Sequence, residues 1–313
     1  MPIDPSDPAA VLRLATRSSP LALVQVDLVT AAIAGLAGSG RHVPETVSME
    51  TIGDRRRDVP IHAIGGRGVF AKEVDEAVLH GAADASVHSA KDLPSNLADG
   101  LVIGAFLPRA DPRDAIVGLP LLELPPGGLV ATGSVRRRAQ LAWLRPDLRF
   151  AELRGNMGSR LGKVPQGGAI VVAMAALDRL GWADRAAQVL STTEMLPQVG
   201  QGAVAVCCRR GDAQALEQLQ AVDDLATRAA VEAERAWLHA VGGGCDAPVA
   251  AHARVGAGGE VRLEAMIATL DGHAMVRQAI IGTDPAELGE TLAVHMLDEC
   301  GGRALLDQTG VAS

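Results

Sequence analysis

Short apolar segments that resemble strands alternate with helical segments over the first two thirds of the chain. This alternation limits the possible folds more than any other feature. The first pair is a strand at residues 11–16 and a helix at 20–36, with Ser19 as N-cap and Pro20 at the first helical position. Such a pattern is typical of parallel α/β sheets. Further strands are predicted at 43–51, 85–87, 101–106, 115–117, 129–131, 149–153, 169–173 and 203–207.

The last third of the chain follows a different pattern. An amphipathic helix over residues 224–240 precedes three alternating stretches, at 248–254, 261–269 and 274–281, and a closing helix at 285–299. This order predicts a small α+β domain. Because 313 residues are many for one hydrophobic core, we expect three domains, the second beginning near residues 108–112.

Composition restricts the class of protein. Apolar residues make up 48% and charged residues 21%, and no apolar run is long enough to span a bilayer. The first residues lack the basic and apolar regions of a secretory signal, so we expect a cytoplasmic protein. The net charge of −8 argues against a nucleic-acid partner. The cysteines lack zinc-ligand spacing, so no metal site is predicted.

Arginines gather at three strand-to-helix junctions, in residues 15–20, 131–138 and 153–160. The start of a helix carries unpaired N–H groups and partial positive charge, so a cation there is unfavourable. Either these arginines are solvated on loops, or an anion binds at the junctions and removes the conflict. Arginine suits planar, two-oxygen groups. The second interpretation predicts a ligand with several separate acidic groups, and the absence of a P-loop motif argues against a nucleoside triphosphate.

A fourth junction, residues 87–94, places Lys91 beside Asp92 before Pro94. One interpretation is a surface ion pair in a turn. The other is a carboxylate that stabilises a developing positive charge in the ligand crevice, with Lys91 near an acidic group of the ligand.

Cys245 follows three consecutive glycines, residues 242–244, and precedes Pro248. Glycines in a row permit backbone conformations and close approaches that other residues resist. The loop therefore presents the thiol at the end of the 224–240 helix, or else Cys245 is a small core residue.

The chain resembles hydroxymethylbilane synthase, the family also called porphobilinogen deaminase. The resemblance is collinear and extends from Leu12 to the C-terminal helix. The matching runs are residues 15–23, 65–70, 88–94, 111–115, 133–137, 153–156, 199–203 and 242–248.

The resemblance implies two lobes like those of periplasmic binding proteins and a small C-terminal α+β domain. The corresponding domains are residues 1–108 with 203–221, residues 109–202, and residues 222–313. It also implies a dipyrromethane cofactor joined to Cys245 by a thioether. Four porphobilinogen molecules then add head to tail, each losing ammonia, and water releases the linear tetrapyrrole hydroxymethylbilane. A monomer is expected.

The resemblance also assigns roles to residues. Asp92 would stabilise the positive charge of the azafulvene that forms when ammonia leaves. A larger set would bind the acetate and propionate groups of the cofactor and substrate: Arg17, Ser19, Gln25, Ser89, Lys91, Thr132, Ser134, Arg136, Arg137, Arg154, Asn156, Arg160, Arg179 and Gln201.

Three positions depart from the family pattern: Arg67 stands where lysine is usual, Gly133 where serine or threonine is expected, and Cys207 where an acidic residue is expected. Arg67 lies in a long loop, residues 53–68, of the kind that often forms a lid. The three departures concern the behaviour of this loop and ligand affinity more than chemistry.

Three other functions are alternatives. The strongest alternative is a non-catalytic, two-lobed protein that binds polyanions, which would have no use for Cys245. A second is a cysteine hydrolase with Cys245 as nucleophile and His88 or His239 as base. A third is a DNA-binding regulator, which conflicts with the acidic charge balance.

Overall fold

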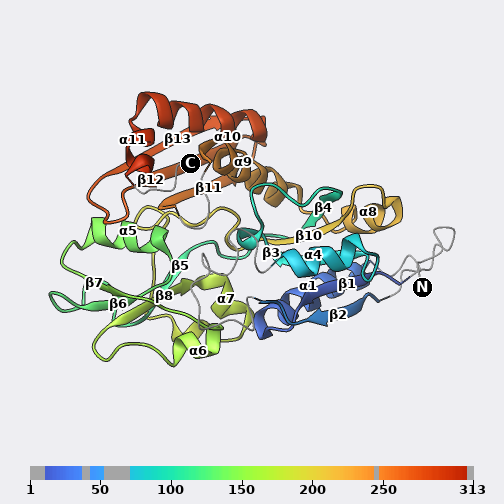
Figure 1. The fold of residues 1–313 in the computed structure, drawn as a ribbon, viewed down its shortest axis with the longest axis horizontal. Coiled ribbons are helices and arrows are strands. Elements are labelled where there is room, and N and C mark those ends of the chain that lie inside the picture. The colour runs from blue at the N-terminus through green and yellow to red at the C-terminus, as the bar shows by residue number, and fades with distance from the viewer. Residues whose placement is uncertain (1–10, 37–42, 53–70, 243–246, 309–313) are drawn as a thin grey trace. The chain divides into compact units, whose positions relative to one another are not determined.

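The computed structural model describes residues 11–36, 43–52, 71–242 and 247–308. The chain divides into two compact units, residues 1–109 with 203–228 and residues 110–202 with 229–313. The strands form three sheets (Figure 1). No helix in the described ranges is both long and apolar enough to cross a bilayer.

Unit 1 contains a five-stranded sheet in the order β2-β1-β3-β10-β4. Helix α1 begins as predicted, with Pro20 in its first turn and the Ser19 hydroxyl accepting from the Ala22 N–H at 3.4 Å. Apolar residues of α1 and α8 pack on one face of the sheet, and those of α4 pack with Ala15 and Leu101 in a separate cluster. The elements are β1 (Arg13–Arg17), α1 (Pro20–Gly35), β2 (Glu45–Met49), α4 (Lys72–Leu79), β3 (Ala85–Ser89), a 3-10 turn (Ala90–Asp92), β4 (Leu101–Phe106), β10 (Val204–Arg209) and α8 (Ala213–Gln220).

Unit 2 contains a second five-stranded sheet, in the order β7-β6-β8-β5-β9. Leu141 of α5 packs in one apolar cluster of this sheet, and Leu177 of α7 packs in another. The elements are β5 (Asp114–Gly118), β6 (Leu129–Ala131), α5 (Val135–Leu144), β7 (Arg149–Ala151), α6 (Met157–Leu161), β8 (Ala169–Ala173), α7 (Met174–Arg179), a 3-10 turn (Ala183–Arg185) and β9 (Gln188–Val189).

The prediction of parallel sheets is wrong for one strand in each of the two five-stranded sheets. Strands β1, β2 and β3 are parallel, but β10 runs antiparallel to β3. Likewise β5 runs antiparallel to β8, while β6, β7 and β8 are parallel. Both antiparallel strands are the first to follow a crossing of the chain from one unit to the other. They enter without the helical crossover that forces parallel pairing, so their direction is free.

The C-terminal α+β pattern is confirmed. Strands β11 (Val249–Val255), β12 (Val261–Ala268) and β13 (Met275–Gly282) form an antiparallel meander. Trp237 of α9 (Leu225–Val241) and Leu292 of α10 (Pro285–Val294) pack in its apolar core. The predicted closing helix changes to a π-helical turn at His295–Glu299, and α11 (Gly302–Asp307) was not anticipated.

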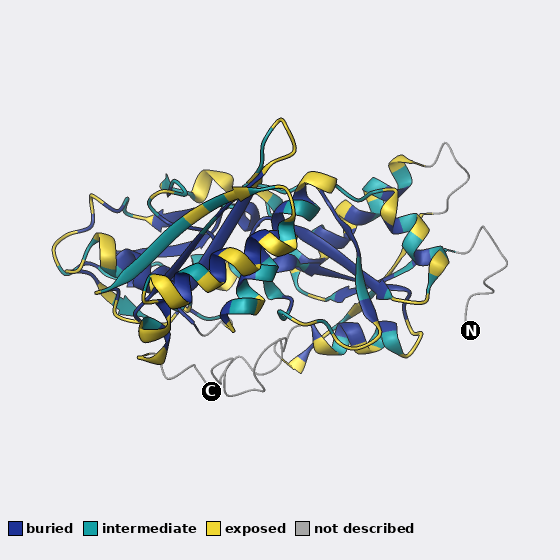
Figure 2. Ribbon diagram, turned by 90° about the horizontal axis from the view of Figure 1, so that it is seen from above, coloured by how far each residue is buried: buried dark blue, intermediate teal, exposed yellow. Residues whose placement is uncertain are grey.

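The burial pattern shows why these elements form. In Figure 2 many strands are dark blue, and the helices alternate between dark blue or teal and yellow. Strands β2, β7 and β13 contain no buried residue. Strand β8 is buried along its whole length. The fold class predicted from the sequence, two α/β lobes and a small α+β domain, is confirmed. The three-domain boundaries stay a prediction.

Candidate active site

Asp114, at the start of β5, organises two of the predicted arginines. Its carboxylate is completely buried and contacts the guanidinium groups of Arg136 (Nη1 to Oδ2, 2.8 Å) and Arg137 (Nε to Oδ1, 2.9 Å). Arg136 also donates to the Leu196 carbonyl, and Arg137 donates to the Val171 carbonyl. Both arginine side chains are therefore buried and held in place inside unit 2.

Gln201, another predicted residue, joins this cluster from the loop before β10. Its amide Nε2 donates to Asp114 Oδ1 at 3.0 Å and to the Pro112 carbonyl at 2.7 Å. Its Oε1 lies 3.5 Å from Arg137 Nη2. Arg179 reaches the same loop by donating from Nη2 to the Gly202 carbonyl at 2.8 Å.

The cluster carries excess positive charge, because two guanidinium groups face one carboxylate. Burial would raise the pKa of Asp114, but the charges of Arg136 and Arg137 and hydrogen bonds from Arg136 and Gln201 hold that pKa far below its usual range. Burial lowers the pKa of Arg137 to about 10, and the neighbouring Arg136 adds to the effect against the opposing charge of Asp114. Burial likewise lowers the pKa of Arg179. An additional anion would relieve this imbalance.

Three buried arginine N–H groups lack partners among the residues that the structure describes: Nε and Nη2 of Arg136 and Nε of Arg179. Buried donors are nearly always paired, and leaving one unpaired costs about 1–3 kcal/mol. Carboxylate oxygens are the strongest acceptors for such donors. The donor set of unit 2 therefore fits a carboxylate-rich group such as a dipyrromethane with acetate and propionate arms.

The positions of the arginines differ from those expected from the helix dipole. Of the arginines predicted to bind the ligand, only Arg136 and Arg137 lie in the first turn of a described helix, α5, and the anion beside them is Asp114 of the same chain. Arg17 and Arg154 precede the N-cap residues of their helices. Arg160 lies in the last turn of α6, where a cation is favourable.

Polar side chains cap the two helices at these junctions. The Ser134 hydroxyl accepts from the Arg137 N–H at the start of α5, and Thr132 Oγ1 accepts from the Ser134 N–H at 3.2 Å. Asn156 Oδ1 accepts from the Ser159 N–H at the start of α6. Each group accepts from the backbone, and among the described residues none takes a hydrogen bond from its own O–H or N–H, so that donor can serve a ligand.

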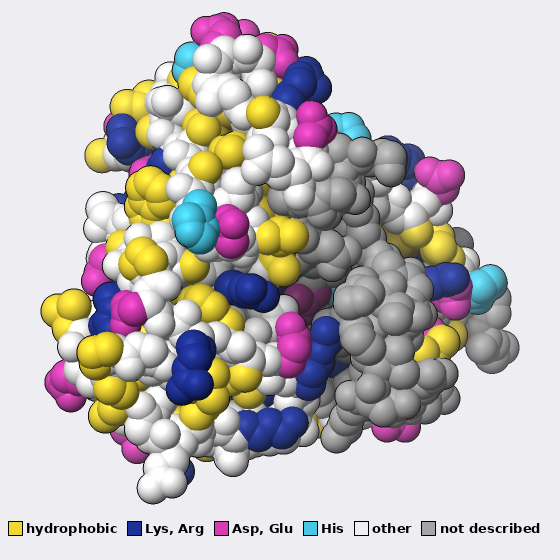
Figure 3. Space-filling view, turned by 60° about the vertical axis from the view of Figure 1, so that its left-hand side comes forward, with side chains coloured by type: hydrophobic (Ala, Val, Ile, Leu, Met, Phe, Trp, Pro, Cys, Tyr) yellow, Lys and Arg dark blue, Asp and Glu magenta, His cyan; other side chains and the backbone are white. Residues whose placement is uncertain are grey.

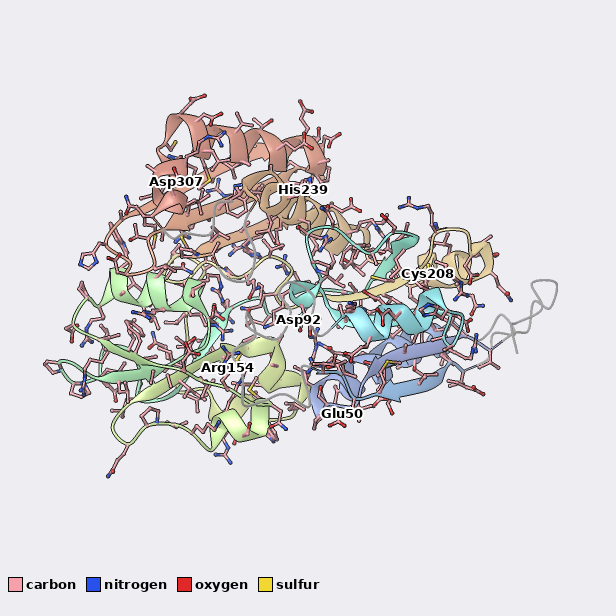
Figure 4. All side chains as sticks on the ribbon, in the orientation of Figure 1. Glu50, Asp92, Arg154, Cys208, His239 and Asp307 are labelled. Atoms are coloured by element: carbon pink, nitrogen blue, oxygen red, sulfur yellow. The ribbon has the colours of Figure 1, made fainter. Side chains whose placement is uncertain are left out.

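The remaining arginines of unit 2 are more exposed. Arg154 Nε lies 3.7 Å from the exposed Glu152 carboxylate, and the Arg160 Nε donates to the Gly155 carbonyl at 2.8 Å. Figure 4 labels Arg154 in the connection between β7 and α6. A long pair with an exposed partner, such as Arg154–Glu152, contributes little to stability, so the Arg154 guanidinium can exchange this partner for a ligand.

In unit 1 the structure brings together the predicted residues Gln25 and Ser89. Gln25, from α1, is buried and donates from Nε2 to the Ser89 hydroxyl at 2.7 Å, at the end of β3. Arg17 ends β1, and Ser19 caps α1 at the neighbouring junction. Lys91 lies half-buried in the 3-10 turn after β3.

Asp92 closes that same turn and is half-buried. Figure 4 labels it at the end of the turn after β3. Within the described part of the chain, no group hydrogen-bonds or pairs with its carboxylate. An unpaired, half-buried carboxylate at a strand end suits a group that meets its positive partner in the ligand.

His88 is buried and pairs with a buried carboxylate of the neighbouring helix α4. Its Nε2 lies 2.8 Å from Asp75 Oδ1, and the Ser86 hydroxyl donates to the same oxygen; all three side chains are buried. This buried cluster joins α4 to β3 and does not favour the cysteine-hydrolase alternative. Cys245 and Arg67 lie outside the described residues.

The departure at Gly133 has a local cause. A Cβ atom at this position would lie 2.8 Å from the Leu153 carbonyl oxygen, closer than side-chain carbons normally approach. The glycine lets the segment before α5 approach the segment before α6. Cys207, the third departure, is completely buried in β10.

Asp114 is the main residue that sequence reasoning missed. The signal was present: a carboxylate begins an otherwise apolar strand, and two adjacent arginines need a counter-charge. One cavity of unit 2, of about 390 Å³, contains no predicted residue; it is lined by Asp111, Pro112, Arg113, Ser191, Thr192, His252 and Arg254.

Comparison with known proteins places this arrangement in a family. Residues 12–217 match the family model described as the dipyromethane cofactor binding domain of porphobilinogen deaminase, and residues 228–298 match that of its C-terminal domain. Among solved structures, a TRAP periplasmic solute binding protein from Desulfovibrio salexigens has a TM-score of 0.41 at 12% identity, covering 68% of this chain and 72% of that one. A likeness this low carries no argument.

Curated relatives match nearly the whole chain. A porphobilinogen deaminase from Acidothermus cellulolyticus is 46% identical over 299 residues, 92% of this chain and 89% of that protein. One from Brevibacillus brevis is 40% identical over 300 residues, 94% of this chain and 96% of that protein. With both domain models matched in order and relatives of this similarity along its length, the chain belongs to the porphobilinogen deaminase family.

Proposed function

We propose that Asp92, Cys245 and the arginines described above carry out, in this chain, the reaction of the porphobilinogen deaminase family. As a member of that family, the chain is a transferase of tetrapyrrole biosynthesis that uses a dipyrromethane cofactor. It joins four porphobilinogen molecules head to tail with loss of ammonia and releases hydroxymethylbilane.

The observation that carries the residue assignment is the local excess of positive charge around Asp114 in unit 2. Arg136 and Arg137 share one carboxylate, and buried N–H groups of Arg136 and Arg179 lack partners within the described ranges. Each pyrrole carries an acetate and a propionate, which supply the missing acceptors and the missing negative charge. Arg17, Arg154 and Arg160 bind further carboxylates, with hydrogen bonds from Ser19, Gln25, Ser89, Lys91, Thr132, Ser134, Asn156 and Gln201.

The cofactor is held through the sulfur of Cys245 and by these arginines. When bound, it supplies the pyrrole carbon to which the first porphobilinogen is joined. Holding both reactants on one chain makes each addition effectively intramolecular, which lowers the barrier. The arginines orient the acidic arms of each incoming porphobilinogen.

Asp92 acts on the substrate as ammonia leaves. Its carboxylate stabilises the positive charge that develops on porphobilinogen and accepts hydrogen bonds from pyrrole N–H groups. The half-buried setting strengthens this interaction relative to open solvent, because the local dielectric is lower.

We further propose a monomeric, cytoplasmic protein that does not bind nucleic acid or membranes. The net charge of −8 supports this. On the face shown in Figure 3, the described Lys and Arg side chains lie among hydrophobic and acidic ones. A non-catalytic polyanion-binding protein is the alternative, and it would bind porphobilinogen without releasing ammonia.

The test is ammonia release from porphobilinogen by the wild type, Asp92→Asn and the control Asp99→Asn, which changes an exposed carboxylate nearby. We expect wild type and control to release ammonia alike, and Asp92→Asn to bind substrate but turn over about 10²–10³-fold more slowly. Near-wild-type turnover by Asp92→Asn would remove Asp92 from the mechanism. Binding by the wild type without ammonia release would favour the alternative.

A further inference from the structure

Glu234 of α9 is a completely buried carboxylate that no role described so far explains. Its Oε2 accepts from the Gly200 N–H at 2.7 Å, and its Oε1 accepts from the Ala253 N–H of β11, also at 2.7 Å. The Nδ1 of His252 lies 3.4 Å from Oε1. One side chain thus joins helix α9, the loop before β10 and the C-terminal sheet. The residues that make these contacts all belong to unit 2.

The neighbours of Glu234 on its own helix are apolar, which disfavours a charged carboxylate there. Its helical neighbours Ala230, Ala233, Trp237 and Val241 all belong to the apolar core of the C-terminal domain. Burying a charge costs several kcal/mol unless hydrogen bonds compensate. For packing alone, an apolar residue of similar volume would serve as well or better. The carboxylate is therefore explained by what its two oxygens hold.

One of those oxygens holds Gly200, and the next two residues of the same loop contact Asp114 and the buried arginines. Gly200 has a left-handed φ of 70° and donates to Glu234. Gln201 donates to Asp114 and lies beside Arg137. The Gly202 carbonyl accepts from Arg179. A shift of this loop would move contacts of both Arg137 and Arg179.

We propose that Glu234 is a positioning residue: it fixes the 200–202 loop so that Arg137 and Arg179 are aligned to bind the carboxylates of cofactor and substrate. The inference rests on the proposed function, because it assigns those arginines to the ligand. Glu234 acts through the Gly200 N–H and Gln201, and it touches no reacting atom.

Glutamine is the sharpest substitution. Glu234→Gln keeps the size of the side chain but turns one acceptor oxygen into an NH2 group, which then faces a backbone N–H. One of the two links must break. Glu232→Gln is the matched control, because Glu232 lies on the exposed side of the same helix. Gln201→Met removes the polar contacts of the loop one step further along the same route.

The first measurement needs no activity. Hydrogen exchange of peptides covering residues 198–203 should be at least about tenfold faster in Glu234→Met than in wild type and Glu232→Gln, because methionine removes both acceptor oxygens and the Gly200 N–H loses its partner. Unchanged exchange in this segment would overturn the proposal.

The second measurement separates positioning from packing. At a temperature where all variants are folded, we expect Glu234→Gln and Gln201→Met each to raise KM for porphobilinogen about tenfold, with a smaller effect on kcat. The double variant should be no worse than the worse single variant, because both changes cut the same route. Effects on KM that multiply in the double variant would overturn the proposal. A wild-type KM in Gln201→Met would also overturn it, and this result can be obtained even if Glu234→Gln does not fold.

These measurements distinguish failure of the proposed function from failure of the role proposed for Glu234. If wild type and Glu232→Gln release no ammonia, the proposed function falls and this inference falls with it. If they do, and Glu234→Gln matches them in KM, only the role of Glu234 is wrong.

Discussion

Replacing Asp114 by asparagine tests the electrostatic core of unit 2. Asn keeps the shape of the side chain and removes the only negative charge known to face the guanidinium groups of Arg136 and Arg137 in the described structure. The three side chains are 0%, 4% and 8% exposed, so water cannot replace that charge. Removing one partner from a buried pair of this kind costs about 3–5 kcal/mol.

For a unit of this size, about 1 kcal/mol shifts Tm by roughly 2–4 °C, so Asp114→Asn should lower Tm by about 6–20 °C. The assay is thermal unfolding followed by circular dichroism at neutral pH. Asp111→Asn is the control. Asp111 lies three residues before Asp114 and pairs with Arg113 in a more exposed setting. Its Tm should stay within about 2 °C of wild type.

The pH dependence of the difference gives a second check. The pKa of Asp114 is lower in the folded protein than in the unfolded chain, so its stabilising contribution is complete above the unfolded value of about 4. The contribution disappears as pH falls from that value through the folded pKa. The Tm difference between wild type and Asp114→Asn should therefore be constant above about pH 5 and shrink in stronger acid. A difference below about 2 °C at pH 7 would refute the reasoning.

Two further predictions concern backbone and thiol. Gly202→Ala should lower the free energy of unfolding in urea by more than about 2 kcal/mol, because the φ of Gly202 is +89° and a Cβ would lie 2.5 Å from the Ala110 carbonyl oxygen. The control Gly211→Ala should change this free energy little, because a Cβ there meets nothing within 4 Å. Equal effects of the two variants would contradict the prediction. Burial, with a smaller contribution from Asp212, raises the pKa of Cys208 to about 11. Iodoacetamide at pH 8 should therefore leave Cys208 unmodified in the folded protein. Peptide mapping that finds Cys208 alkylated before unfolding would contradict this.

Much of the fold could be predicted from sequence because it depends on local signals. The Ser19 cap, the strand–helix alternation and the three C-terminal strands follow from side-chain type and periodicity. The direction of β5 and β10 could not be predicted in this way. A buried strand has the same composition whichever way it runs, and the direction of these two depends on how the chain crosses between units.

The site was predictable in its residue types and less so in its internal pairing. The arginine-rich junctions indicated an acidic ligand, but Asp114 and Arg136 are 22 residues apart in sequence, and only the fold shows that they pair. Glu234 was hidden for a similar reason. On an amphipathic helix it reads as a surface residue, whereas its acceptors are filled by Gly200 and Ala253 from distant segments.

The central claim is that Cys245 carries a primer built from two porphobilinogen units. Intact-mass spectrometry of wild type and Cys245→Ala, both purified from a host that makes porphobilinogen, tests it most directly. The account predicts that wild type is heavier than its polypeptide by two condensed pyrrole units, while Cys245→Ala has the bare mass. A wild type at the bare mass, or an added mass that persists in Cys245→Ala, would contradict it.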